Sequence, residues 1–397
     1  MPTSPRLCLR RGSLLLLLFA AVAPSTLAFL LPSLPPSPST STRLALSPLS
    51  SPSSDTLSTL EAPPLPTLAV DEQGRSRLPW KKEGYSYWTW QGNQIHYVAL
   101  EGENARQSNK PPIVLIHGFG ASVFHWRYNI PALAENHRVY AIDLLGFGLS
   151  AKPLTEYNAE VWRNQLAAFL QEIVGVGGSL GGPKAIVVGN SLGGYTALAT
   201  AAFHPELVQA CAVLNGAGSF DPPPEAVAAV EVTRLKLNKT RSGKGYLLDG
   251  LKERLGHAAR RVVLYSAFFY TKQPGRIKQV LQQVYLNKDN VDDELVESIR
   301  YPSLHPNAAE VFCRVVTRTS TQGALTTVNK LLSMLDMPLL LLWGDRDPWI
   351  SPRMAERMRD LYPAAKRVGL DAGHCPHDEV PEAVNSELLK WIEEMSP

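Results

Sequence analysis

The chain has 397 residues, of which 45% are hydrophobic and 19% are charged, a composition typical of a globular protein with a sizeable core. The formal net charge is only +3, so no strong positive field indicates nucleic acid as a partner. The four cysteines are far apart and show no CxxC spacing, so we expect neither a disulfide framework nor a bound metal.

Residues 1–28 have the features of a signal peptide. A segment with three arginines, residues 1–11, precedes an apolar run at residues 14–23 that is too short to span a bilayer comfortably. Ala28 has the small side chain that suits a cleavage site. The alternative interpretation of this segment is a short membrane anchor.

Residues 29–79 are expected to be a transit peptide or a disordered linker. The stretch up to about residue 66 is rich in Ser, Thr, Pro and Leu and poor in acidic residues, which is typical of plastid transit peptides. With Phe29 at the junction, the two leader segments resemble the two-part presequence of algae with secondary plastids. A linker in a secreted protein is the alternative. Either way, we expect the folded domain to cover residues 80–397.

This domain is predicted to have an α/β fold. A hairpin is expected from residues 85–90 and 94–100, and short apolar runs then alternate with longer helical patterns. Such alternation indicates a mostly parallel central sheet with helices on both faces. The six apolar runs cover residues 113–116, 139–142, 185–188, 210–214, 339–343 and 366–370, and a last helix is expected at 381–394.

One long segment, at about residues 219–327, breaks the alternation with helical patterns and little strand pattern. Helices are expected near residues 222–232, 250–271 and 289–301, so we interpret the segment as a helical cap inserted between strands of the sheet. Within it, residues 262–270 are interpreted as a helix packed on the body, with a pocket wall as the alternative.

The most informative motif is GNSLG, in which Ser191 lies between Gly189 and Gly193, after an apolar strand and before an alanine-rich helix. Glycines without a Cβ allow a sharp turn and close packing, and the turn would hold the serine in a strained conformation at the N-terminus of the helix. This arrangement predicts a nucleophile elbow in which Ser191 attacks the substrate.

A serine nucleophile needs a base, and two later strands end in suitable residues. Asp347 and His374 follow these strands in the order serine, acid, histidine that such a fold uses. Asp345 is the rival acid, and Asp347 is preferred because a proline follows it. His377 is the rival base, and His374 is preferred because it follows its strand directly. Asp371, a further acidic residue after that strand, is expected to cap a turn.

The HGFG segment is expected to complete an oxyanion hole. Its two donors would be the backbone N–H groups of Leu192 and Phe119, with Gly118 and Gly120 letting the loop approach the substrate. His117 is interpreted as a histidine that braces this loop.

Three further residues near these motifs are given packing roles. His125 and Trp126 are expected to be a satisfied core pair, with lining of the acyl pocket as the alternative. Cys375, next to the candidate base, is expected to fill space.

With these motifs placed, residues 80–397 resemble the α/β-hydrolases. The segments IHGFGASVFHWRYNIPALAENHRVYAIDLLGFGLS, VVGNSLGGYTALATAAFHPELV, NVDDELVESI and PNAAEVF resemble plant and algal chlorophyll dephytylases, relatives of the pheophytinases. The resemblance implies hydrolysis of the phytyl ester of chlorophyll by Ser191, Asp347 and His374, without a metal or organic cofactor. It also implies a chlorophyll-like pigment as the hydrophobic partner and a location in the chloroplast, either stromal or in peripheral contact with the thylakoid membrane.

Three other functions are weighed against this one. A pheophytin-specific enzyme or a general carboxylesterase or lipase would use the same residues. A ligand receptor is the alternative of another class, because a fold alone does not determine a function. Epoxide hydrolases and dehalogenases use an aspartate nucleophile, so Ser191 argues against both.

Overall fold

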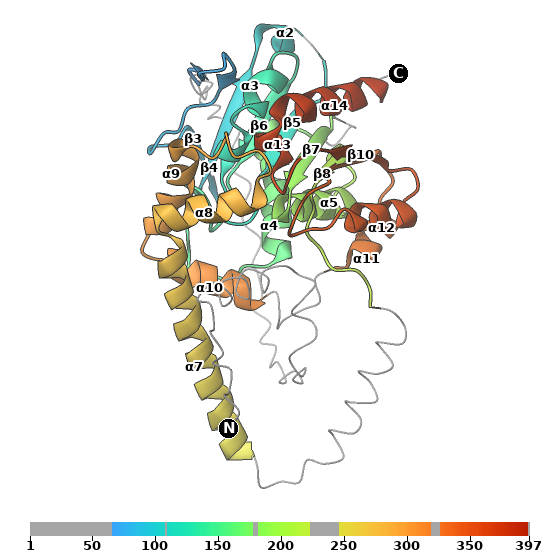
Figure 1. Cartoon of the computed structure of the whole chain (residues 1–397). Coiled ribbons are helices and arrows are strands. Elements are labelled where there is room, and N and C mark those ends of the chain that lie inside the picture. Colours follow the sequence, from blue (N-terminus) through green and yellow to red (C-terminus); the bar gives the residue numbers. More distant parts are fainter. Residues whose placement is uncertain (1–65, 108, 178–181, 223–245, 319–325, 396–397) are drawn as a thin grey trace, which may run out of the picture.

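The computed structural model describes residues 66–107, 109–177, 182–222, 246–318 and 326–395 (Figure 1). The predicted signal peptide and most of the predicted transit segment lie outside these residues, as does nearly all of the helix expected at 222–232. The side chains of most of residues 246–258 are also not described.

The core of the molecule is an eight-stranded sheet with the order β10-β9-β8-β7-β5-β6-β4-β3. The strands from β10 to β6 are parallel to their neighbours, whereas β4 and β3 are added antiparallel at one edge. The predicted α/β fold with a mostly parallel sheet is therefore confirmed, and each expected strand is present. The bounds are β3 Ser86–Trp90, β4 Asn93–Glu101, β5 Ile113–Ile116, β6 Arg138–Ile142, β7 Ala185–Asn190, β8 Val208–Leu214, β9 Leu339–Gly344 and β10 Lys366–Leu370.

Helices cover both faces of this sheet (Figure 1). Because successive side chains of a strand point to opposite faces, Val114 and Ile116 belong to one apolar cluster and Ile113 and Leu115 to the other. The first cluster contains α4 (Ala159–Phe169), α5 (Leu192–Phe203), α11 (Val328–Ser333) and α12 (Arg353–Leu361), and the second contains α3 (Asn129–Ala134) and α14 (Pro381–Glu394). Shorter elements are α2 (Glu103–Arg106), η2 (Val123–Trp126), η3 (Leu170–Val174), η4 (Pro302–Leu304) and α13 (Pro376–Glu379).

The described part of the segment between β8 and β9 contains helices joined by loops, and no strand. The α-helices described here before α11 are α7 (Tyr246–Thr271), α8 (Pro274–Val284), α9 (Asp293–Arg300) and α10 (Ala308–Arg318). Helix α9 begins at Asp293 because the side chain of Asp292 accepts a hydrogen bond from the N–H of Leu295 at 2.7 Å. In the described part of the chain, no helix combines the length and apolar character needed to cross a membrane.

The folded part begins earlier than residue 80, so the expected boundary between leader and domain is too late. Residues 69–70 and 76–77 form a two-stranded sheet, β1 (Ala69–Val70) and β2 (Ser76–Arg77). Leu78 is fully buried, and Arg75 hydrogen-bonds to the side chains of Tyr128 and Asn290. These long-range contacts fasten the segment to the body.

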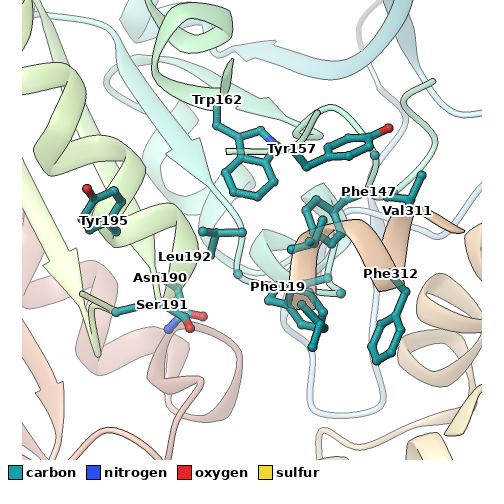
Figure 2. A pocket seen from close by; sticks show the side chains of 18 of the residues that line it. Phe119, Phe147, Tyr157, Trp162, Asn190, Ser191, Leu192, Tyr195, Val311 and Phe312 are labelled. Carbon is teal, nitrogen blue, oxygen red and sulfur yellow. The ribbon is translucent and has the colours of Figure 1, made fainter. Parts of the chain in front are cut away.

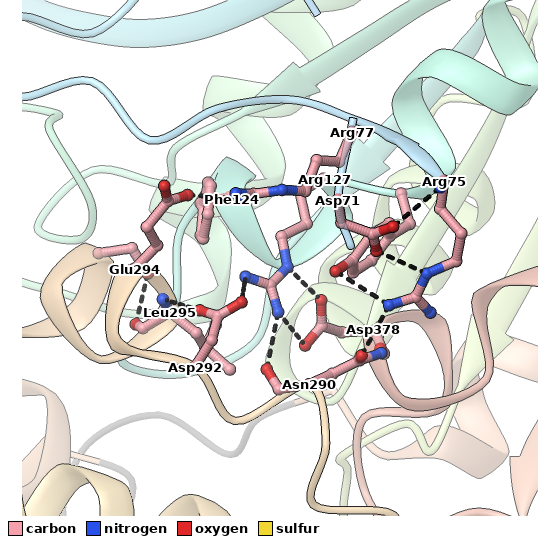
Figure 3. Close-up of polar contacts among 12 residues, drawn as sticks. Asp71, Arg75, Arg77, Phe124, Arg127, Asn290, Asp292, Glu294, Leu295 and Asp378 are labelled. Carbon is pink, nitrogen blue, oxygen red and sulfur yellow. Dashed lines mark hydrogen bonds and ion pairs between the residues drawn. The ribbon is translucent and has the colours of Figure 1, made fainter. Parts of the chain in front are cut away.

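A buried ion network holds the helical insertion against the body (Figure 3). The fully buried guanidinium of Arg127 donates to Asp378 at 2.9 Å, to Asp292 at 2.7 Å and to the carbonyl of Asn290 at 2.7 Å. These partners lie on α13 and on the segment before α9, so one side chain joins three regions that are far apart in the sequence. A buried charge is tolerated only when it is paired and hydrogen-bonded, and removal of one member would leave the other without compensation.

Candidate active site

Ser191 lies at the sharp turn between β7 and α5, with φ 55° and ψ −115°. A positive φ is strained for a residue with a Cβ, so the surrounding structure must hold it in place. The N–H of Ser191 donates to the carbonyl of Leu214 at 3.0 Å, and its own carbonyl accepts from Tyr195 and Ala217 at 3.1 and 3.0 Å. The serine therefore sits at the helix N-terminus in the strained geometry that the GNSLG motif predicts.

The two glycines of the motif allow the backbone segments to meet around this turn. A Cβ on Gly189 would overlap the carbonyl oxygen of Gly193, and a Cβ on Gly193 would overlap the carbonyl oxygens of Ile116 and His117. Any larger residue would push α5 away from β7 and β5, so both positions depend on glycine for close approach.

Asp347 and His374 meet at the carboxyl ends of β9 and β10. The His374 Nδ1 atom lies 2.7 Å from the Asp347 Oδ2 atom, and both side chains are buried. A carboxylate can only accept, so Nδ1 is the donor and Nε2 is left to accept a proton. His374 and Ser191 line the same cavity. The Asp347–His374 pair and Ser191 therefore border one cavity, where we consider them candidates for base and nucleophile.

The rival residues are occupied elsewhere. Asp345 is partly exposed and forms an ion pair with Arg367 at 2.5 Å. Asp371 is largely exposed and pairs with Arg346 at 2.8 Å. His377 is fully buried, its ring lies 4.1 Å from that of Trp126, and neither ring nitrogen has a hydrogen-bond partner among the described residues. These positions leave Asp347 and His374 as the acid and base candidates.

Two asparagines that sequence reasoning missed align these candidates. Asn215 has φ 43°, and its Nδ2 donates to Asp347 Oδ2 at 2.7 Å while its Oδ1 accepts from the N–H of Gly344 at 2.9 Å. Asn190 Nδ2 donates to the carbonyl of His374 at 3.0 Å. Both asparagines stand at the end of a parallel strand, where α/β sheets gather their sites, and that position was the available signal.

The helical insertion also reaches the candidate base. The N–H of His374 donates to the carbonyl of Val284, the last residue of α8, at 2.9 Å. A Cβ on the neighbouring Gly373 would overlap that same carbonyl oxygen. The loop that carries the base is therefore packed directly against the insertion.

The HGFG loop lies against the elbow. A Cβ on Gly118 would be 3.2 Å from the Cβ of Ser191, whereas Gly120 has φ 72° and faces open space. Phe119 and Leu192 both line the cavity beside Ser191 (Figure 2). The N–H of Leu192 belongs to the first turn of α5, where N–H groups have no acceptor within the helix. Both N–H groups remain candidates for the oxyanion hole.

His117 braces this loop, as its interpretation from the sequence anticipates. It is fully buried, and its Nδ1 lies 2.7 Å from the carbonyl oxygen of Gly118 while its Nε2 accepts from the N–H of Leu144 at 3.0 Å. Burial lowers the pKa of His117, so the ring is neutral, which matches one donating and one accepting nitrogen.

The cavity has a volume of about 790 Å³ and is rich in aromatic side chains. Body and insertion both contribute to it, since Ser191 and Phe147 come from the body whereas Val311 and Phe312 come from α10 (Figure 2). A buried ammonium, that of Lys152, also lines it, and burial lowers the pKa of this lysine to about 8. The aromatic residues around the cavity are Phe119, Phe147, Tyr157, Trp162, Tyr195, Phe203, Phe268, Phe312 and Trp349.

Two packing interpretations need correction. His125 lines the cavity, and neither its Nε2 nor the Nε1 of Trp126 has a partner among the described residues, so the two are not a satisfied core pair. Residues 262–270 are not simply packed on the body, because Phe268 lines the cavity whereas Val263 is half exposed. Both expectations failed because a cavity lies between the insertion and the sheet, and sequence patterns do not show where surfaces remain apart.

Cys375, next to the candidate base, is buried and borders the cavity. Burial raises the pKa of its thiol well above the usual value, so it is protonated at neutral pH and is a poor nucleophile. Its position is compatible with the space-filling role expected of it.

The chain has clear relatives among known proteins. A family model described as the alpha/beta hydrolase fold matches residues 111–381. Pheophytinase of Arabidopsis thaliana, a chloroplastic protein, is 27% identical over 348 residues, which are 78% of this chain and 66% of that protein. Bifunctional epoxide hydrolase 2 of Mus musculus is 26% identical over 337 residues, 76% of this chain and 54% of that protein. The chain thus spans two thirds or less of the length of these relatives.

Solved structures also resemble this chain. A membrane phospholipase A described as a bacterial virulence factor superposes with a TM-score of 0.56 at 25% identity, covering 78% of this chain and 85% of that one. A meta-cleavage product hydrolase from Pseudomonas fluorescens superposes with a TM-score of 0.58 at 20% identity, covering 80% of this chain and all of that one, and supports the fold alone. From the matched family model together with the sheet and its helices, the chain belongs to the α/β-hydrolase family.

Proposed function

We propose that this chain is a serine hydrolase that cleaves a carboxylic ester, and that its substrate is the phytyl ester of chlorophyll, which it would convert to chlorophyllide and phytol. The observation that carries the reaction class is the bond between His374 Nδ1 and Asp347 Oδ2, in the cavity that Ser191 also lines. A strained serine, a histidine that can act as a base and a buried aspartate that orients it are the parts that acyl transfer needs.

In the proposed reaction, Ser191 attacks the ester carbonyl while Nε2 of His374 takes the hydroxyl proton. The N–H groups of Leu192 and Phe119 would stabilise the negative charge that develops on the carbonyl oxygen. Protonated His374 then gives its proton to the leaving alcohol, and Asp347 stabilises the imidazolium in the meantime. A water molecule, deprotonated by His374, releases the acid from Ser191 and restores the starting state.

The cavity supports a large apolar ester as the substrate. A twenty-carbon phytyl chain needs ~600 Å³ if each carbon takes roughly the 30 Å³ of a water molecule, and the cavity of about 790 Å³ can hold it. Such a substrate starts in lipid rather than in water, so its transfer to an aromatic pocket gains little hydrophobic free energy. Recognition would therefore depend on shape and on the few polar groups of the lining, among them Lys152 and His125.

The relatives support this choice over the alternatives. Pheophytinase is among the curated proteins that this chain resembles, and the leader composition is typical of a plastid protein, so we propose the chloroplast as the location. Epoxide hydrolases are relatives of similar identity, but the chain has a serine where an aspartate nucleophile would be needed. A general esterase and a pheophytin-specific enzyme remain the rival hydrolases, and a ligand receptor is the rival of another class.

One comparison of substrates separates these functions. The purified full chain is incubated with chlorophyll a, pheophytin a and a short p-nitrophenyl ester, and kcat/KM is measured for each. The proposal expects the highest value for chlorophyll a, and a higher value for pheophytin a would indicate the pheophytin-specific rival. A preference for the short ester would indicate a general esterase, and turnover of none of the three would favour a receptor.

A further inference from the structure

Helix α7 has an exposed apolar face along the stretch whose side chains the structure describes. Val262 is 66% exposed, Val263 53%, Phe269 51% and Tyr270 39%. At 100° per residue these four side chains fall on one side of the helix, which we call the α7 outer face. Two pairs of these side chains lie on the same side of the helix, on either side of the exposed Ser266. Large apolar side chains are usually scattered singly on a surface, so this grouping indicates a binding surface.

The opposite side of the same helix is held firmly. The carboxylate of Glu310 on α10 accepts from Arg261 at 2.5 Å and from Tyr265 at 2.6 Å. The rings of Phe268 and Phe312 lie 5.5 Å apart, and both line the cavity. This end of α7 is therefore fixed to α10, with Phe268 at the cavity and the α7 outer face on the other side of the helix. Figure 1 shows α10 beside this end of α7.

The outer face is bordered by positive charge. Residues 259–278 contain five Lys and Arg residues and no Asp or Glu, and two of the five, Arg261 and Lys278, form ion pairs with Glu310 and Asp293. The cations that border the outer face are therefore Arg260, Lys272 and Arg276. The Nζ of Lys272 lies 4.5 Å from the centre of the Phe269 ring, and the guanidinium of Arg276 lies 4.4 Å from the centre of the Tyr270 ring. Arg260 is exposed on the other side of the outer face. Apolar and aromatic side chains flanked by cations are the pattern of helices that lie in the interface of an anionic bilayer.

We propose that the α7 outer face docks on the surface of an anionic lipid bilayer, with its apolar side chains among the acyl chains and its cations at the phosphate or sulfate headgroups. The charge favours this partner over a second copy of the chain, because two α7 outer faces in contact would bring two cationic borders together. The docking rests on the proposed function in one respect, which is that the substrate is an ester dissolved in the bilayer. Docking through α7 would bring the cavity, which Phe268 of α7 lines, close to that substrate.

The test uses an environment-sensitive naphthalene dye attached to a cysteine at position 263 of the full chain. Cys211, Cys313 and Cys375 are buried, so Cys8→Ser together with Val263→Cys provides one reactive thiol. A dye placed by Leu361→Cys on α12 is the matched control, because Leu361 is an exposed leucine on a different helix. Emission is recorded with vesicles of phosphatidylcholine alone and of phosphatidylcholine with an equal part of phosphatidylglycerol. This readout reports the burial of the face itself, even if the apolar leader also binds the vesicles.

The proposal expects a blue shift of the dye at position 263 with the anionic vesicles, and no shift at position 361. Adding Arg260→Gln and Arg276→Gln should weaken the apparent vesicle affinity at least tenfold. The proposal is overturned if the dye at 263 does not respond, if both dyes respond alike, or if both vesicles give the same shift. A shift that grows with protein concentration without vesicles would assign the face to a second copy instead. Hydrolysis of the short p-nitrophenyl ester by the same samples tests the proposed chemistry separately.

Discussion

Replacing Asp347 by asparagine keeps the shape of the side chain but changes what its two terminal atoms can do. In the structure, Oδ1 accepts from the N–H groups of Trp349 and Ile350 at 2.7 and 3.1 Å, and Oδ2 accepts from Asn215 Nδ2 and His374 Nδ1. All four neighbours therefore donate to this carboxylate. An asparagine has only one oxygen, so in either orientation its NH₂ group faces donors.

The two orientations do not cost the same. With the NH₂ group toward Trp349 and Ile350, it would meet two backbone N–H groups that cannot turn away. With the NH₂ group toward Asn215 and His374, it would meet one donor, the Asn215 NH₂ group, that is held in place, but the His374 ring can respond by moving its proton from Nδ1 to Nε2. That tautomer cannot take a proton from Ser191, and the carboxylate charge that stabilises the imidazolium is also lost. We therefore expect kcat to fall about 10⁴-fold, the loss that this change causes in a serine triad, equivalent to about 5.4 kcal/mol.

The assay is turnover of the p-nitrophenyl ester, with Asp345→Asn as the matched control. Asp345 is two residues away, and its partly exposed ion pair with Arg367 should contribute at most about 1 kcal/mol to stability. This control should keep kcat within about threefold of the wild type, a change of about 0.6 kcal/mol. If Asp345→Asn lost more activity than Asp347→Asn, the assignment of the acid would be wrong.

Three further outcomes are expected. Arg127→Met leaves its carboxylate partners uncompensated and should lower the free energy of unfolding in urea by about 3–5 kcal/mol. The control Arg359→Met, which breaks an exposed ion pair, should change it by under about 1 kcal/mol. Equal effects of the two variants would contradict the stabilising role of the buried network. Burial raises the pKa of Glu379 to about 7 from an ordinary 4.5, so between these pH values the folded state holds a proton that the unfolded state releases. The wild type should therefore lose thermal stability relative to Glu379→Gln as the pH rises from 4.5 to 7. If the difference in melting temperature between the two proteins did not change with pH, this prediction would be refuted. A fluorescent fusion of residues 1–75 should colocalise with chlorophyll, and deletion of Phe29 should leave it outside the plastid; secretion of the intact fusion would contradict the proposed location.

The sheet could be predicted closely because its parallel strands are buried on both faces and therefore form continuous apolar runs. The run at 113–116 coincides with β5, which is buried throughout, and the run at 339–343 falls within the equally buried β9. Strand β10 has its expected bounds although it is a partly exposed edge strand, and the final helix coincides with α14. The candidate triad could also be proposed, because its members follow such strands. The strand pattern indicates that each of these side chains lies at the carboxyl edge of the sheet.

Long-range contacts could not be predicted in this way. Arg127 and Asp378 are 251 residues apart, and nothing in the local pattern around either one indicates a buried ion pair. The contacts of Arg75 that extend the fold before residue 80 are of the same kind. Asn215 was missed because its role depends on a left-handed backbone and on the position of Asp347, which only the packed structure defines.

The most direct test of the proposed reaction is the rate at which the full chain releases phytol from chlorophyll a, compared between the wild type and Ser191→Ala. Ser333→Ala, at an exposed serine of α11, serves as the control. The proposal predicts that Ser191→Ala loses at least about 10³-fold in kcat/KM while its unfolding midpoint stays that of a folded protein, and that Ser333→Ala keeps the wild-type rate. Release of phytol by Ser191→Ala at close to the wild-type rate would contradict the central claim.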